Sequence, residues 1–361
     1  MPAYDRNMDL EVDRTDLRRT RLTPGRPVPD EPSTGSVLFR IDNFGLTANN
    51  VTYAVVGDLM GYWRFFPTSG DSWGRVPVWG FAEVEASSHG DVADGERYFG
   101  YWPMSSHVLL EPVGVGPQGF TDGASHRADL SPIYNRYQRA ARDDADAEAR
   151  RSILQPLFGT SFLLDDWLGS EEMFGADAVV VSSASSKTAL GLAHLLSRRE
   201  QARVIGITSS THVDFVRSTG TYDEVIGYAD LPAGLGDGTA VLVDLAGDRA
   251  VLHAVHGHFG SALRRSVQVG FTHHDAPTDA EGLPGPQPEL FFAPDHAQRR
   301  SAEWGAATFA ERLETARAGF DQGPGASIAI DRKKGVDEVM AAWLDAVDGR
   351  ADPSTAVVCS W

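Results

Sequence analysis

The first third of the chain consists of short apolar runs separated by glycine-containing turns. Residues 36–42 (SVLFRID) alternate apolar and polar positions, residues 76–86 are rich in valine and aromatic side chains, and residues 98–110 contain another apolar stretch. Alternation with a period of two and short runs of such residues are typical of β-strands. We therefore expect a barrel-like β domain here. Alanine, arginine and acidic residues then dominate residues 136–151, which predicts a helix with a solvated charged face.

After residue 157 short apolar runs alternate with helical patterns. The predicted strands are residues 178–181, 203–208, 224–226, 240–245, 267–271 and 290–293, and the predicted helices between them include 188–199 and 212–219. Short buried strands that alternate with helices predict a parallel, doubly wound α/β domain. After residue 294 we expect helices at 309–318 and 336–347 and strands at 327–330 and 356–359.

Length and composition agree with a globular protein of two domains. The chain has 361 residues, which is longer than a single hydrophobic core usually covers, and 42% of its residues are hydrophobic. A net charge of -18 argues against nucleic-acid or membrane partners, because such a surface repels phosphates and anionic lipids. The arginines of residues 14–26 are interpreted as a solvated N-terminal segment.

Neither a signal peptide nor a long apolar span is visible in the sequence, so we expect a cytoplasmic protein. Its single cysteine, Cys359, excludes intramolecular disulfides and a cysteine-based zinc site, and we expect it to pack in the terminal strand. His253, His256 and His258 have metal-like spacing. No carboxylate or cysteine joins them in sequence, which favours solvated or capping roles.

The most informative segment is 178–195 (AVVVSSASSKTALGLAHL), where an apolar strand leads through small residues into a helix. Such a turn binds a pyrophosphate when backbone N–H groups and the helix N-terminus point at it. Small side chains replace the usual glycines here, and a lysine adds positive charge; the candidate contacts are Ser182, Ala184, Ser185, Ser186, Lys187 and Thr188. By itself the turn also fits a serine N-cap of an ordinary helix. A Walker A loop is disfavoured, because both of its glycines are missing.

The end of the second predicted strand indicates which dinucleotide would bind. NAD-binding proteins usually place Asp or Glu there, on the ribose hydroxyls. This chain has Thr208-Ser209-Ser210-Thr211-His212 instead. Hydroxyls and a histidine accept a 2′-phosphate that a carboxylate would repel, so Ser209, Ser210 and His212 favour NADP(H). Arg217 is a further candidate, unless it is simply solvated.

Taken together, these segments resemble the medium-chain dehydrogenase/reductase superfamily, in its zinc-free quinone and enoyl reductase branch. The resemblance implies a GroES-like, β-barrel-type substrate domain (residues 1–158 and 299–361) and a doubly wound Rossmann cofactor domain (residues 159–298). Ala184 matches the alanine of the family's phosphate turn, Tyr228 follows the third strand, and Phe271 and Thr272 end the fifth strand, which faces the nicotinamide in relatives. Gly80-Phe81-Ala82 stands where zinc-dependent members have Gly-His-Glu, which implies that no metal is bound.

The same resemblance suggests catalytic candidates in the first domain. The segment from Gly45 to Gly61 is similar to a region that borders the substrate in zinc-free relatives and can supply a proton. Tyr62 is the leading proton donor, Tyr53 and Tyr101 are weaker candidates, and Asn50 is a further catalytic candidate in the same region. A half-buried tyrosine of a β domain is an equally good interpretation of Tyr62.

We therefore expect a zinc-independent, NADPH-dependent reductase that acts on an apolar activated alkene, quinone or carbonyl compound, free or thioester-linked. The many aromatic residues of the first domain either line an apolar substrate pocket or form its core. The alternative is a reductase-like fold retained as a non-catalytic binding or regulatory module. The resemblance also implies a homodimer.

Overall fold

The computed structural model describes residues 7–25, 28–269 and 282–361. Contacts divide the chain into two compact units. Unit 1 comprises residues 1–153, 330–351 and 355–361, and unit 2 comprises residues 154–329 and 352–354. The chain thus returns to unit 1 about thirty residues later than the predicted domain bound at residue 299. The cause is local: Trp304 and Phe309 pack on Phe162 of unit 2, with ring centroids 6.4 and 6.1 Å from it.

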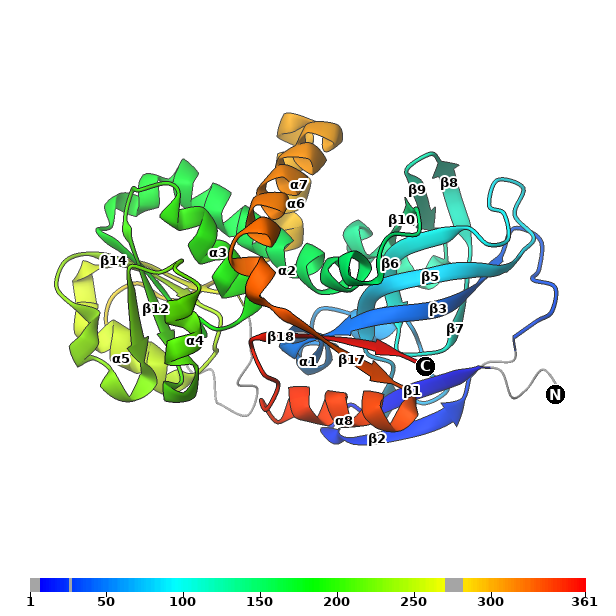
Figure 1. Ribbon diagram of the computed structural model, residues 1–361, viewed down its shortest axis with the longest axis horizontal. Helices are drawn as coiled ribbons and strands as arrows, with labels where there is room; N and C mark the ends of the chain where they lie inside the picture. The colour runs from blue at the N-terminus through cyan, green and yellow to red at the C-terminus, as the bar shows by residue number, and fades with distance from the viewer. Residues whose placement is uncertain (1–6, 26–27, 270–281) are drawn as a thin grey trace. The chain divides into compact units, whose positions relative to one another are not determined.

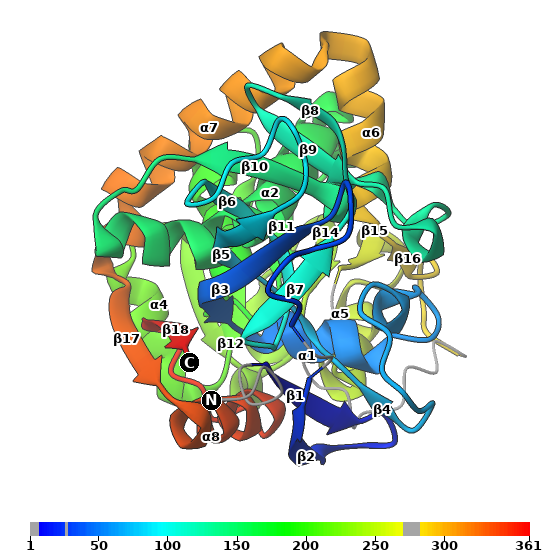
Figure 2. The ribbon, with the colours of Figure 1, turned by 90° about the vertical axis from the view of Figure 1, so that its right-hand side faces the viewer.

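Unit 1 is built mainly from antiparallel strands. A small sheet has the order β2-β1-β4, and a larger one the order β17-β18-β3-β5-β6-β10-β9-β8, with β7 paired to β3. Figure 2 shows β3, β5 and β6 as neighbours. The bounds are β1 Met8–Asp13, β2 Asp16–Pro24, β3 Val37–Leu46, β4 Trp73–Gly74, β5 Pro77–Ser87, β6 Arg97–Pro103, β7 His107–Leu110, β8 Pro112–Gly116, β9 Gly119–Asp122, β10 Arg136–Ala140, β17 Ala329–Lys334 and β18 Thr355–Ser360, with helices α1 Ala48–Val55 and α8 Val336–Val347.

The core of unit 1 is aromatic. Phe39 lies against Tyr98 and Trp102, and the Trp102 indole N–H donates to the carbonyl of Gly80 at 2.9 Å. Trp343 of α8 joins this core and donates to the carbonyl of Leu17 in β2. The N-terminal hairpin and α8, blue and red in Figure 1, therefore lie side by side.

The helix predicted at 136–151 is wrong in its first part. Residues Arg136–Ala140 form β10, which pairs with β6 and β9, and helix α2 begins only at Ala145. Tyr137 explains the difference, because its fully buried ring packs on Trp102 and Phe120. This long-range packing overrides the helical preference of the local alanines and arginines.

Most of the arginine-rich segment belongs to the hairpin of β1 and β2, and several of its arginine side chains remain exposed to solvent. Arg21 donates to Glu11 at 2.5 and 2.8 Å and stacks on Trp73, 4.1 Å from its ring centroid. Arg19 donates to Asp13 at 2.8 Å. These cations therefore neutralise acidic residues of β1.

Unit 2 contains a parallel sheet of six strands among the described residues, in the order β13-β12-β11-β14-β15-β16. This is the strand order of a doubly wound Rossmann sheet. The order of the strands reverses between β11 and β14, although all strands run parallel. Figure 1 shows α3, α4 and α5 beside its strands. The bounds are β11 Ala178–Val181, β12 Arg203–Thr208, β13 Glu224–Gly227, β14 Ala240–Asp244, β15 Leu263–Gln268, β16 Glu289–Leu290, α2 Ala145–Ser170, α3 Lys187–Ser197, α4 Val213–Ser218, α5 Arg249–Phe259, α6 Ala293–Trp304 and α7 Ala306–Gln322.

The central strands of unit 2, β11, β12 and β14, are almost fully buried, as expected of a sheet covered on both faces. The fifth strand begins four residues earlier than predicted, and the chain enters α6 where the sixth was expected to end. In the part of the chain that the structure describes, no helix is long and apolar enough to cross a membrane.

Candidate functional site

The turn between β11 and α3 lies at the carboxyl end of the parallel strands. Ser183 has a φ of 51°, in the left-handed region that glycine usually occupies. Ala184 is fully buried, and a Cβ on Gly206 of β12 would come within 2.9 Å of the Ala184 Cβ. The close approach of the turn to β12 therefore requires a small residue at position 184 and glycine at position 206.

Ser182 is turned into the protein rather than toward the turn's open side. Its hydroxyl donates to Asp244 Oδ1 at 2.5 Å and accepts from the amides of Leu245 and Ala246. Asp244 itself is fully buried and also accepts from the amide of Gly247. Burial raises the pKa of the Asp244 carboxyl, although these donors oppose the shift. Ser182 therefore joins β11 to β14, a structural use of a residue that we predicted to bind a cofactor.

The start of α3 offers backbone N–H groups without acceptors. Ser186 is the N-cap, and its hydroxyl accepts from the amide of Ala189 at 3.2 Å. Among the described residues, the amides of Ser185, Lys187 and Thr188 have no hydrogen-bond acceptor. Helix N-termini of this kind bind anions, because the amides and the helix dipole both favour negative charge.

Lys187 stands beside these amides. It is one of only three lysines in the chain, and its ammonium donates to the carbonyl of Pro353 at 3.2 Å. Desolvation lowers the pKa of Lys187 to about 8, an effect that the charge of Asp352 partly offsets. The side chain is still predominantly a cation at neutral pH.

The turn is connected to the end of β12 by polar side chains. Thr208 donates to the Ser185 hydroxyl at 3.3 Å, and this hydroxyl lies 3.4 Å from Nδ1 of His212. Ser209 is half-buried and Ser210 is exposed, both just beyond the strand. The structure thus brings Ser185 and His212 together, as expected if both face one ligand.

The remaining predicted cofactor residues divide into two groups. Tyr228 accepts a hydrogen bond from the amide of Ser183 at 3.2 Å, and burial raises the pKa of its phenol to about 12. Phe271 and Thr272 lie outside the described residues.

In unit 1 the predicted catalytic tyrosines belong to a tyrosine cluster, which we define as Tyr53, Tyr62, Tyr101 and Tyr134. The Tyr62 and Tyr134 hydroxyls share a hydrogen bond of 3.1 Å, and Tyr53 accepts from the indole N–H of Trp79 at 3.2 Å. The ring centroids of Tyr53 and Tyr62 are 4.6 Å apart. The cluster therefore brings together the leading candidate, Tyr62, and the weaker candidates Tyr53 and Tyr101, and it adds Tyr134.

Burial determines the protonation of this cluster. Desolvation raises the pKa values of all four phenols, and those of Tyr101 and Tyr134 lie well above the ordinary value. The Tyr101 hydroxyl is buried without a partner among the described residues. These phenols stay protonated at neutral pH and can donate hydrogen bonds, but burial makes each a weaker acid.

Asn50 has a structural position. Its side-chain oxygen accepts from the amide of Thr47 at 2.8 Å, completing a capping box on α1, and its amide donates to the carbonyl of Pro77 in β5. Both ends of this buried side chain are therefore used to hold α1 on the sheet.

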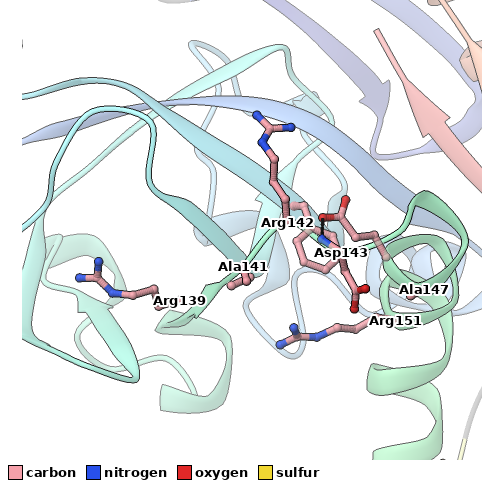
Figure 3. A pocket seen from close by; sticks show the side chains of 9 residues that line it. Arg139, Ala141, Arg142, Asp143, Ala147 and Arg151 are labelled. Carbon is pink, nitrogen blue, oxygen red and sulfur yellow. Dashed lines mark hydrogen bonds between the residues drawn. The ribbon is translucent and has the colours of Figure 1, made fainter.

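A pocket of about 430 Å³ opens in unit 1 (Figure 3). It is lined by Phe81, Arg139, Ala140, Ala141, Arg142, Asp143, Ala147, Glu148 and Arg151. The Arg151 guanidinium lies over Phe99, 4.6 Å from its centroid, and Figure 3 shows Arg142 and Arg151 extending away from each other. The pocket is therefore bordered by charged groups. Most of the aromatic residues that we considered for an apolar pocket are instead buried in the core of unit 1.

The histidines with metal-like spacing lie on α5 and are used separately. His256 is buried between the Pro284 carbonyl and the Ser266 hydroxyl, at 2.8 and 2.9 Å. His258 bonds to the carbonyl of Gly236. Within residues 7–25, 28–269 and 282–361, no three His, Cys, Asp or Glu side chains are grouped as metal ligands.

A protein-family model described as "Protein of unknown function (DUF2855)" matches residues 44–352. The chain belongs to the DUF2855 family. A comparison with curated protein sequences found no match.

Solved structures of low sequence identity share the fold of this DUF2855 chain. CurA from Vibrio vulnificus, in complex with NADPH, is 15% identical over 94% of both chains, with a TM-score of 0.59. The CurK enoyl reductase is 13% identical over 99% of both chains, with a TM-score of 0.60. The yhdH oxidoreductase from Salmonella enterica, in complex with NADP, is 13% identical over 98% of this chain and 99% of that chain, with a TM-score of 0.53. These likenesses confirm the predicted fold, a GroES-like, β-barrel-type domain together with a doubly wound Rossmann domain.

Three residues of these DUF2855 sites were missed by the sequence analysis. Tyr134 lies in a short 3₁₀ helix, Pro132–Asn135, a context that carries no catalytic signal. Asp244 ends the fourth Rossmann strand, where a buried acid could have been noticed. Asp352 lies 165 positions after Lys187 in the chain, so only the fold brings the two together.

Proposed function

We propose that this chain is a zinc-independent reductase that uses NADPH. The observation that carries the proposal is the group of free amides of Ser185, Lys187 and Thr188 beside a lysine cation, at the carboxyl end of a Rossmann sheet. Ligands of doubly wound sheets bind at this end, at the point where the strand order reverses. Proteins of the same fold, CurA and the yhdH oxidoreductase, were solved with NADPH and NADP.

The serine-for-glycine turn is compatible with such a cofactor. Ser183 adopts the left-handed conformation despite its side chain, and Ser182 directs its hydroxyl to Asp244 instead of into the turn. Ala184 is held away from the open side by its contact with Gly206. No side chain larger than serine therefore stands at 182–186 to keep a pyrophosphate from the backbone.

Within this proposal each group has a part. The amides of Ser185, Lys187 and Thr188 would hold the pyrophosphate, and Lys187 would add a charge-assisted bond. Ser209, Ser210 and His212 would face the 2′-phosphate. When bound, NADPH supplies a hydride for reduction.

The substrate side of the proposal rests on the tyrosine cluster. Tyr62 would hold the proton that a reduced carbonyl, alkene or quinone must receive, because its phenol is protonated at neutral pH. Tyr134 shares its hydrogen bond with Tyr62 and would position it. An apolar substrate suits these rings, and a thioester would satisfy the same chemistry.

A second candidate is a reductase-like binding module without catalysis. The observation that favours it is the closure of the tyrosine cluster, whose hydroxyls at 53, 62 and 134 already bond to neighbours. Burial also raises the pKa of Tyr62 and weakens it as an acid.

Two measurements test these candidates. Titration with NADPH and with NADH, each followed by nicotinamide fluorescence, should give an enhanced, blue-shifted signal, and binding of neither would contradict both the cofactor site and the enzyme. The second measurement is the consumption of NADPH, monitored by the absorbance of the reduced nicotinamide, with a panel of enones, quinones and aldehydes as substrates. Binding without turnover of any of them favours the module.

We also infer a homodimer. The edge strand β16 carries Leu290, whose side chain is 59% exposed, and exposed edges of this kind can pair with a second copy. Light scattering of the purified chain checks this inference, since a monomer mass would contradict it.

A further inference from the structure

A short segment near the C-terminus belongs to the candidate nucleotide site. Residues 352–354 are part of unit 2, although the chain on both sides of them belongs to unit 1. The carbonyl of Pro353 accepts the hydrogen bond from Lys187 at 3.2 Å. The segment therefore lies against the start of α3, next to the free amides.

The side chain of Asp352 places a carboxylate in this segment. Its Oδ1 accepts from the amide of Ser354 at 2.8 Å and from the Ser354 hydroxyl at 2.7 Å, which fixes the side chain on its own turn. The Asp352 residue remains exposed. The pKa of Asp352 is lowered, first by the hydrogen bonds from Ser354 and further by electrostatic interaction with Lys187 and His212, so the carboxylate lies near both side chains.

Lys187 and His212 mark the ends of the region where the adenosine ribose of a dinucleotide is expected, beyond the first two strands of the sheet. The sequence after β12 has no acid there, which is why it favours a 2′-phosphate. The fold supplies one from the other end of the chain. We propose that Asp352 limits, without abolishing, the preference of this site for NADPH over NADH, because its carboxylate opposes the additional phosphate of NADPH. This inference rests on the proposed function, since it requires that a nicotinamide dinucleotide binds.

The test removes the negative charge of Asp352 but keeps the hydrogen bonds that its side chain accepts from Ser354. In Asp352→Asn the amide oxygen can still accept from Ser354, whereas the negative charge is lost. Removing one charge near a 2′-phosphate of charge about −2 should tighten NADPH binding about five- to tenfold and change NADH binding less than about twofold. Fluorescence titrations of wild type and variant with each nucleotide give the ratio of the two dissociation constants.

Asp237→Asn is the matched control. Asp237 is exposed and precedes β14, at the amino end of the sheet strands. Its substitution therefore removes the same charge from the opposite end of the sheet. We expect its ratio to equal that of the wild type. The gain in Asp352→Asn should also shrink at high salt, because the carboxylate is exposed and its field is screened.

The outcomes are distinct. A raised preference for NADPH in Asp352→Asn alone supports the inference. Binding of both nucleotides with an unchanged ratio overturns the role of Asp352 but leaves the nucleotide site intact. Binding of neither nucleotide to any form of the protein overturns the site itself, and with it this inference.

Discussion

The β11–α3 turn of unit 2 and the tyrosine cluster of unit 1 are both rich in hydroxyl groups, but they differ in what remains available for a ligand. In the turn, Ser182 and Ser186 use their hydroxyls to fix the backbone, and three amides are left without acceptors. In the cluster, the Tyr62 and Tyr134 hydroxyls bond to each other, Tyr53 accepts from Trp79, and the rings pack closely. The side chains of the turn thus hold a backbone whose amides can bind a ligand. The side chains of the cluster pack on one another and hold no such group of amides.

A residue that shapes a candidate binding site need not itself contact the ligand. Ser182 was predicted to contact a cofactor, yet it acts through Asp244 beneath the turn. Tyr62 was predicted to donate a proton, yet its hydroxyl shares a hydrogen bond with that of Tyr134.

The largest effect is expected from Asp244→Ala. This change leaves the Ser182 hydroxyl and buried amides of the β14 loop without their acceptor, and we expect a loss of about 3–5 kcal/mol in the free energy of unfolding. Urea denaturation, followed by a probe of unit 2, measures it. Asp237→Ala serves as the control, and equal stability of the two variants would show that Asp244 does not hold the turn.

Lys187→Met should weaken NADPH binding about ten- to thirtyfold, because a charge-assisted contact to phosphate contributes roughly 1.5–2 kcal/mol. Fluorescence titration gives the dissociation constants. Lys333→Met, in β17 of unit 1, removes the same charge and should leave NADPH binding unchanged. If the two variants bind alike, Lys187 is not at the phosphate.

The pH dependence of binding provides a third prediction. The pKa of Lys187 is lowered to about 8, so its cation is present at pH 7 and mostly lost at pH 9.5. We expect NADPH to bind several-fold more weakly at pH 9.5, by about the factor that one charge contributes. Lys187→Arg, which stays charged, should remove this dependence, and a parallel decline in that variant would point to another group.

The same lysine has a predicted effect on stability. Its folded-state pKa lies below its unfolded value, so folding releases a proton between the two. Below pH 8 the full cost of desolvating the cation is present, and stability rises as the pH increases from about 8 toward the unfolded value. Comparing wild type with Lys187→Met over this window isolates the contribution, which vanishes if the ammonium is solvated.

The smallest effects are expected in the tyrosine cluster. Tyr134→Phe removes the bond to Tyr62 and should cost about 1 kcal/mol of unfolding free energy. Tyr101→Phe should be neutral or slightly stabilising, because the hydroxyl it removes is buried without a described partner. Neither should alter NADPH affinity. A costly Tyr101→Phe would mean that this phenol has a partner, such as bound water.

Much of the fold follows from local patterns. The apolar runs at 178–181 and 203–208 coincide with β11 and β12, and the serine before Lys187 is the N-cap that small polar residues predict. Residues 136–140 were misread because Tyr137 is placed by partners in β6 and β9, not by its neighbours in sequence.

The candidate site was less accessible to sequence reasoning. The small-residue turn and Lys187 could be identified, because strand, turn and helix are contiguous. The pairing of Ser182 with Asp244 spans 62 positions and that of Lys187 with Pro353 spans 166, so no local pattern reports them. The chemistry of the turn is local, whereas its support and its charge balance depend on the fold.

The central claim is that the start of α3 binds the phosphates of a nicotinamide dinucleotide, and the scarcity of lysine makes it directly measurable. The chain contains only Lys187, Lys333 and Lys334, so labelling with [¹⁵N]lysine should give three amide signals, with Lys187→Arg assigning the first. On addition of NADPH we predict that the Lys187 amide shifts and that the Lys333 and Lys334 amides of unit 1 do not. If NADPH binds and the Lys187 signal stays in place, the claim is contradicted.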